Sequence, residues 1–193
     1  MDLIGLLGGS FNPVHWGHLL VAQAAREELQ LDQVFFLPAA QSPFKPNLTL
    51  APTRLRLQML RLALAGRPEF AVDDQELRRG GISYTIDTVR NYAARYPRAV
   101  IYYLIGGDHV AQLPQWREAT DLARLVRFVV IPRPGQPACP FPPPFVGEAL
   151  RGFPVGLSAS QIRARVQQGL PIDWLVGSAV DEVIRNNRLY LGA

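Results

Sequence analysis

Cysteine is scarce in this sequence, with Cys139 the only one among 193 residues. A disulfide within the chain needs two cysteines and a thiolate metal site needs several, so both are excluded. Long apolar runs are also missing, because no stretch approaches the roughly 18 to 20 residues that a transmembrane helix needs. The first residues show no charged segment followed by an apolar one, as a secretion signal would. We therefore expect a cytoplasmic protein with no membrane span.

Lysine is nearly absent as well. Of the 20 basic residues, Lys45 is the only lysine and the other 19 are arginine. Lysine binds phosphate as a compact point charge, whereas arginine offers a planar fork, but composition alone does not separate such a role from a surface residue. The net charge is +4, and the basic residues are scattered along the sequence. We expect no nucleic-acid partner, and a small polyphosphate substrate fits the mild positive charge.

The apolar pattern alternates between short strands and amphipathic helices. The predicted strands are 3–7, 34–37, 70–72, 100–105 and 128–131, and the predicted helices are 18–29, 52–64, 85–96, 116–125, 160–168 and 176–187. This alternation predicts an α/β fold, a Rossmann-like doubly wound parallel sheet with helices on both faces and a small C-terminal helical extension.

The domain organisation follows from the same pattern. We expect a single domain over residues 1–193, with the core sheet in 1–135, a proline-rich loop in 136–157 and C-terminal helices in 158–193. Eight prolines lie between Pro132 and Pro154, which is too many for regular structure.

The loop after the first strand, Gly8-Gly9-Ser10-Phe11-Asn12-Pro13-Val14-His15-Trp16-Gly17-His18, is the first candidate site. Its glycines let a ligand approach the backbone, and the following helix start offers free N–H groups to a phosphate. His15 and His18 are three residues apart, so both rings can face the same anion. A zinc pair is an alternative, but zinc needs further ligands and the chain has only one other histidine.

This loop resembles the signature of the nucleotidylyltransferase superfamily, and its Ser-Phe-Asn-Pro-Val form is similar to the bacterial nicotinate-mononucleotide adenylyltransferases. The resemblance implies adenylyl transfer from ATP to nicotinate mononucleotide, a step of NAD biosynthesis that gives the deamido-NAD dinucleotide and pyrophosphate. It also implies Mg²⁺ held mainly by substrate phosphates, with no metal site made by the protein.

Four further segments extend the resemblance over almost the whole chain. They are Ser42-Pro43-Phe44-Lys45, Ser83-Tyr84-Thr85-Ile86-Asp87-Thr88, Gly106-Gly107-Asp108 followed by Trp116, and Leu157-Ser158-Ala159-Ser160-Gln161-Ile162-Arg163. Arg133 lies in an Arg-Pro-Gly segment that also resembles the family. Phe44 and Ala159 depart from the family, which usually has a histidine and a hydroxyl residue there, so the roles of those two positions do not carry over.

The resemblance implies a role for each matched residue. The implied catalytic residues are His15, His18, Lys45 and Arg163. The implied ATP-binding residues are Gly8, Gly9, Ser10, Phe11, His15, His18, Gly106, Asp108, Ser158, Ser160 and Arg163. The implied mononucleotide-binding residues are Lys45, Tyr84, Thr85, Asp108, Trp116 and Arg133.

Simpler interpretations remain open at several of these positions. Ser83, Thr85 and Asp108 could cap helices, Trp116 could belong to the core, and Arg133 could be an exposed loop charge. For the whole chain, the alternatives are nucleotidyl transfer to another phosphate acceptor and a non-enzymatic nucleotide-sensing or tRNA-binding protein. The sequence does not separate nicotinate from nicotinamide mononucleotide, and it leaves the oligomeric state open.

Overall fold

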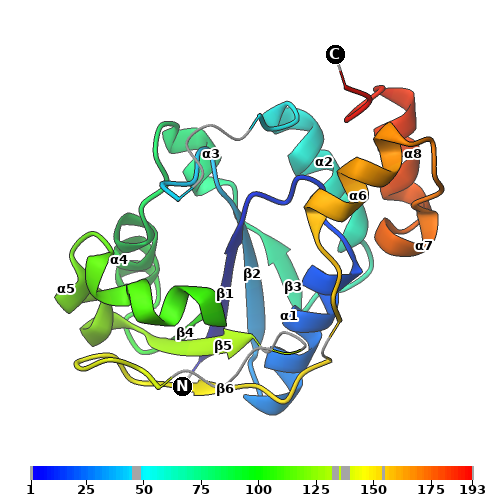
Figure 1. Ribbon diagram of the computed structural model, residues 1–193. Helices are drawn as coiled ribbons and strands as arrows, with labels where there is room; N and C mark the ends of the chain where they lie inside the picture. The colour runs from blue at the N-terminus through cyan, green and yellow to red at the C-terminus, as the bar shows by residue number, and fades with distance from the viewer. Residues whose placement is uncertain (1, 45–48, 132–134, 136–139, 154, 193) are drawn as a thin grey trace.

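The computed structural model describes residues 2–44, 49–131, 135, 140–153 and 155–192 and contains a six-stranded, fully parallel sheet (Figure 1). The strands lie in the order β3-β2-β1-β4-β5-β6. Their bounds are β1 (Leu3–Gly9), β2 (Gln33–Pro38), β3 (Phe70–Val72), β4 (Val100–Gly106), β5 (Arg127–Ile131) and β6 (Gly147–Ala149). The predicted doubly wound sheet is confirmed, and its strand order reverses between β1 and β4, where such sheets bind ligands.

Helices cover both faces of the sheet (Figure 1). One face carries α1 (Trp16–Glu28), α2 (Thr53–Ala63), α6 (Ala159–Gln167), α7 (Asp173–Val176) and α8 (Ser178–Asn186). The other carries α4 (Thr85–Arg95), the 3₁₀ helix η1 (Gly107–Gln115) and α5 (Ala119–Leu125), while α3 (Gln75–Arg79) lies beside α4. No helix in these described parts of the chain is long and apolar enough to cross a membrane.

The core is divided by the sheet because successive side chains of a strand point to opposite faces. In β1, Ile4 and Leu6 pack with α4 and α5, whereas Leu7 packs with the helices of the other face. A parallel strand buried on both faces has a continuous apolar sequence, which is why β1 and β4 are visible in the sequence.

The C-terminal helices share the core of the first face. Ile162 of α6 and Ile184 of α8 belong to the same buried cluster as Leu7 and Phe11 of the N-terminal segment. In Figure 1, α6 lies near the carboxyl end of β1, at the upper edge of the sheet. The last third of the chain is thereby brought to the glycine-rich loop.

The proline-rich segment differs from its predicted form. It contains β6, which pairs in parallel with β5, so the sheet does not end before residue 135 as expected. The prolines of this segment lie before and after the strand. Three residues, Gly-Glu-Ala, at the edge of a sheet have no apolar run, and apolar runs are the signal by which buried strands are recognised.

Two helical predictions are also wrong in detail, and one short helix was missed. The predicted helix 116–125 begins only at Ala119, because residues 107–115 form η1 and Glu118 adopts a positive φ of 53°. The helix predicted at 176–187 is preceded by the short α7 and separated from it by Gly177, with φ 86°. The five-residue α3 was not predicted, since so short a helix has little periodicity.

Candidate active site

The loop between β1 and α1 lies at the switch point of the sheet. Gly8 faces the Tyr103 side chain of β4 so closely that a Cβ atom there would stand 2.6 Å from the hydroxyl oxygen. Phe11 has a φ of 43°, which side chains rarely adopt, and its ring is buried against His18 with centroids 4.9 Å apart. Gly8 and Gly9 thus end β1, and Ser10 and Phe11 begin a closely packed loop, at the position where the resemblance places ATP.

His15 and His18 stand together at the start of α1. Their ring centroids are 3.8 Å apart, and the His15 backbone N–H donates to His18 Nδ1 at 3.2 Å. A neutral imidazole has one N–H, so a His18 ring that accepts at Nδ1 carries its proton on Nε2. His15 is buried and its Nδ1 has no hydrogen-bond partner. A buried polar atom without a partner at a helix start is suited to a ligand.

Burial keeps both rings neutral at pH 7. It lowers the pKa of His15 to about 4, and together with the neighbouring His15 it lowers the pKa of His18 well below its usual range. A bound polyanion favours the protonated form and so shifts both pKa values upward. The pair can therefore donate hydrogen bonds to a phosphate and can take up charge as negative charge develops there.

The pKa of His15 makes the stability of the free protein depend on pH. The unfolded chain takes up a proton at this histidine below pH 6.5, whereas the folded chain does so only near pH 4. Stability therefore falls as the pH drops between these values. From pH 7 to pH 5 we expect wild type to lose about 2 kcal/mol more unfolding free energy than His15→Gln. Urea unfolding of both proteins at the two pH values measures the difference, and equal losses would contradict it.

Arg163 joins α6 to the first loop. Its Nη1 donates to the backbone oxygen of Asn12 at 2.9 Å, and its Nη2 donates to Ser160 Oγ at 3.1 Å. The Arg163 side chain is therefore held by two contacts. The N-cap residue of α6 is Ser158, whose Oγ accepts from the Gln161 backbone N–H at 3.3 Å. The start of α6 thus adds a guanidinium and the Ser160 hydroxyl to the histidine side of the site.

Arg56 is a buried cation that sequence reasoning did not select. Its Nη1 donates to the backbone oxygens of Ser10 at 2.8 Å and Ala39 at 2.9 Å, and its Nε donates to Ala51 at 3.3 Å. Burial lowers its pKa. The guanidinium joins the segments that follow β1 and β2. The sequence could have indicated this burial, because Arg56 lies four residues before Leu60 and so shares the apolar face of α2.

The segment before α4 forms the opposite side of the site. Neither Ser83 nor Thr85 caps the helix, so that alternative is wrong: the N-cap position is Tyr84, with no side-chain cap. Ser83 Oγ instead accepts from the Ala40 backbone N–H at 3.0 Å, just after β2. Thr85 Oγ1 donates to the Tyr103 hydroxyl at 3.4 Å, beside Gly8. The two halves of the site therefore meet at Tyr103.

A buried carboxyl group supports the same segment from below. Thr88 donates its hydroxyl to Glu76 Oε1 at 2.7 Å, and both residues are buried. Burial raises the pKa of Glu76. This contact between α3 and α4 fixes the helix whose first turn carries Tyr84 and Thr85.

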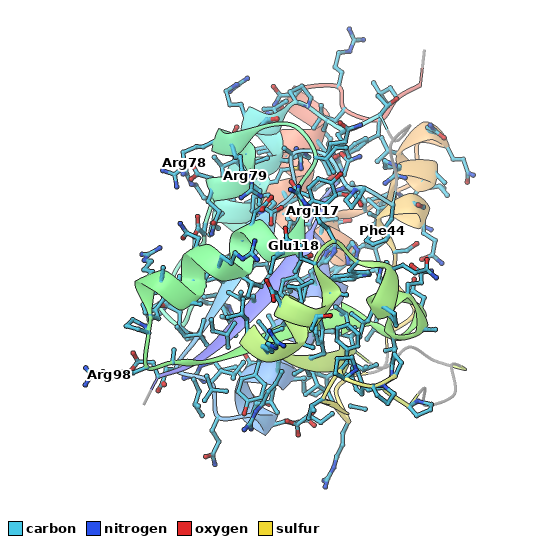
Figure 2. The ribbon with its side chains drawn as sticks, turned by 90° about the vertical axis from the view of Figure 1, so that its left-hand side faces the viewer. Phe44, Arg78, Arg79, Arg98, Arg117 and Glu118 are labelled. Carbon is cyan, nitrogen blue, oxygen red and sulfur yellow. The ribbon has the colours of Figure 1, made fainter. Side chains whose placement is uncertain are left out.

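Three rings gather beside this segment. Phe44 lies 5.2 Å from His109 and 5.7 Å from Trp116 between ring centroids, and Figure 2 shows it together with Arg117 toward the upper part of the face covered by α4 and α5. Trp116 Nε1 and His109 Nδ1 are buried without hydrogen-bond partners. Arg117 lies over the Tyr84 ring at 4.7 Å. Trp116 is half-buried and packs against the core of this face, and its remaining apolar surface suits a flat heterocycle.

The remaining predicted residues are placed as follows. Gly106 ends β4 and Asp108 is exposed in the first turn of η1, where the N-cap position belongs to Gly106. Lys45 and Arg133 lie outside the described residues. Within the described ranges no three His, Cys, Asp or Glu side chains are grouped as metal ligands. Zinc needs such a group, whereas Mg²⁺ bound to phosphate oxygens and water needs few protein ligands.

Comparison with known proteins gives the family. Residues 6–165 match the model of the cytidylyltransferase-like family. A relative from Opitutus terrae, named probable nicotinate-nucleotide adenylyltransferase, is 42% identical over 97% of each chain. A relative of the same name from Shouchella clausii is 43% identical over 98% of this chain and 97% of its own.

Solved structures agree on the fold. The nicotinic acid mononucleotide adenylyltransferase of Plasmodium falciparum, solved with NaAD, superposes with a TM-score of 0.81 over 98% of both chains. Its sequence identity to this chain is 17%, so this likeness concerns the fold. The family model and the two full-length relatives show that the chain belongs to the cytidylyltransferase-like family, as a member of its nicotinate-nucleotide adenylyltransferase group.

Proposed function

We infer that the chain transfers the adenylyl group of ATP to nicotinate mononucleotide, giving the deamido-NAD dinucleotide and pyrophosphate. The observation that carries this is the pair of neutral histidines at the start of α1, with Arg163 held against the same loop by Asn12. The full-length likeness to relatives named for this activity supports the choice of substrates. Both substrates are small nucleotides, and we propose a cytoplasmic reaction without a nucleic-acid or membrane partner.

The chemistry asks for alignment and charge stabilisation. A phosphate oxygen of the mononucleotide attacks the α-phosphorus of ATP, the new P–O bond forms, and the bond to the departing pyrophosphate breaks. A phosphate monoester is largely dianionic at neutral pH, because its second pKa is about 6. The attacking group therefore needs no general base, and catalysis consists of positioning and electrostatic stabilisation.

The site divides naturally between the two substrates. Gly8, Gly9, His18 and Arg163 would bind the triphosphate, since backbone N–H groups, imidazole N–H and guanidinium all favour anions. On the other side, the rings of Trp116 and Tyr84 would bind the pyridine. Thr85 connects this side to the first loop through its contact with Tyr103. Mg²⁺, when bound with ATP, would neutralise phosphate charge. The Arg117 guanidinium lies over the Tyr84 ring and 3.6 Å from the Glu118 carboxylate, so on the side proposed for the pyridine its positive charge is partly offset.

The proposal is tested by the choice of acceptor. The purified chain is given ATP and Mg²⁺ with nicotinate mononucleotide, nicotinamide mononucleotide, phosphopantetheine or glycerol phosphate, and pyrophosphate and dinucleotide are measured. We expect the highest kcat/KM with nicotinate mononucleotide and no turnover when Mg²⁺ is chelated. Faster turnover of another acceptor would favour the first alternative function, and no pyrophosphate release with any acceptor would favour the non-enzymatic one.

Lys45 carries a further prediction within this proposal. It is the chain's only lysine, and the resemblance places it where the two substrate phosphates approach. Lys45→Ala should lower kcat more than it raises either KM, the pattern of a contact made chiefly in the transition state. Lys45→Arg should restore part of the rate. If kcat is unchanged in Lys45→Ala and only the mononucleotide KM rises, Lys45 binds substrate without assisting the reaction.

A further inference from the structure

Asn12 connects the first loop to three distant segments. Its side chain is buried, and Oδ1 accepts from the Tyr190 hydroxyl at 2.8 Å and from the Ala51 backbone N–H at 3.0 Å. Its Nδ2 donates to the Thr49 backbone oxygen at 3.3 Å. Its own backbone oxygen accepts from Arg163 Nη1 at 2.9 Å. The peptide group that orients Arg163 therefore belongs to a residue whose side chain is fixed on three sides.

Tyr190 is the most remote of these partners, 178 positions away in the sequence. It follows α8 with a φ of 65°, a region that side chains rarely adopt and that persists only where the surroundings impose it. The preceding Leu189 is buried in the core of the first face, and its backbone N–H donates to Ile184 of α8 at 3.0 Å. The chain after α8 is thus held so that the ring of Tyr190 turns toward the first loop.

The hydroxyl of Tyr190 is suited to a donor role. Burial raises its pKa, so the group stays neutral and keeps its proton. Arg163 and Arg56 both lie near enough to act on it electrostatically. The phenol therefore lies near both arginines that contact the first loop, and its hydroxyl donates to Asn12 Oδ1.

We propose that Tyr190 is a positioning residue for nucleotidyl transfer: by donating to Asn12 Oδ1 it fixes the Asn12 peptide, which in turn aims the Arg163 guanidinium at the reacting phosphate. This rests on the proposed function. Without the hydroxyl, Asn12 still contacts Thr49 and Ala51, so the backbone of the loop keeps its conformation. The Asn12 peptide is less firmly held, and the Arg163 guanidinium is then less precisely oriented. Small displacements of catalytic groups lower rates strongly, and we expect about a 10-fold fall in kcat.

The first test is Tyr190→Phe, which removes only the hydroxyl. Its matched control is Tyr92→Phe, because the Tyr92 hydroxyl likewise donates to a side-chain oxygen, Asp73 Oδ2, at 2.8 Å, and Tyr92 is even more deeply buried than the half-buried Tyr190. With nicotinate mononucleotide and ATP we expect kcat to fall about 10-fold in Tyr190→Phe and less than twofold in Tyr92→Phe, with both KM values changed less than threefold. Thermal unfolding of both variants shows that each is folded at the assay temperature.

The second test separates positioning from a general structural role. If Tyr190 acts through Arg163, Tyr190→Phe should change kcat less than twofold when made in an Arg163→Ala background. A full 10-fold loss in that background, or an unchanged kcat in the single variant, overturns the inference. Wild type that forms no dinucleotide contradicts the proposed function instead, so the two failures are distinct.

Discussion

His18→Ala is expected to lower kcat by about 100- to 1,000-fold, the usual effect of removing one preorganised donor to developing charge. The His18 ring accepts from the His15 backbone N–H through Nδ1, which leaves the Nε2 proton for the substrate. Because His18 belongs to neither of the two buried apolar clusters that form the core, its loss should leave the fold intact. Steady-state kinetics measure the effect, and circular dichroism with thermal unfolding checks the fold.

Two conservative variants sharpen this prediction. The amide nitrogen of glutamine reaches about as far as Nε2 of histidine, whereas that of asparagine reaches only as far as Nδ1. His18→Gln should therefore keep more activity than His18→Asn. The reverse order would mean that the proton donated to the phosphate is on Nδ1, and near-normal turnover of His18→Ala would remove His18 from the mechanism.

The fold was predictable wherever burial left a clear pattern in the sequence. β4, like β1, is buried on both faces, so its apolar run ends at the glycines of the site, and β3 was predicted with its bounds unchanged. β6 carries one glycine, one glutamate and one alanine, so only its pairing with β5 defines it. The boundary between α7 and α8 depends on the backbone of Gly177, which the periodicity of neighbouring side chains does not report.

The motifs of the candidate site could be predicted from the sequence, but the residues that hold these motifs in place could not. Periodicity and glycine placement locate the loop with His15 and His18, but the roles of individual residues came from resemblance. Tyr190 and Arg56 reach the loop through contacts set by tertiary packing, which one sequence does not contain. Ser83 illustrates the same limit, because a hydroxyl before a helix suggests a cap, while the fold brings the end of β2 to it instead.

Arg163→Ala is expected to lower kcat by about 100-fold, because in the proposed reaction the guanidinium would donate charge-assisted hydrogen bonds to phosphate oxygens of ATP. Arg163→Lys should recover only part of this loss. The arginine contacts Asn12 and Ser160 with two different nitrogens, whereas a lysine has its three N–H donors on one nitrogen and would not reproduce the planar arrangement.

Arg165 provides the matched control for Arg163 on the same helix. Its guanidinium donates to the backbone oxygen of Pro171 at 3.2 and 3.0 Å, and so belongs to the turn after α6. Arg165→Ala removes one positive charge from α6, as Arg163→Ala does, but at a position outside the proposed site. We therefore expect Arg165→Ala to leave kcat within about twofold of wild type. If the two alanine variants lose activity equally, Arg163 contributes only to the general positive potential around α6. If only Arg163→Ala loses activity, its effect comes from the specific geometry that Asn12 imposes on this guanidinium.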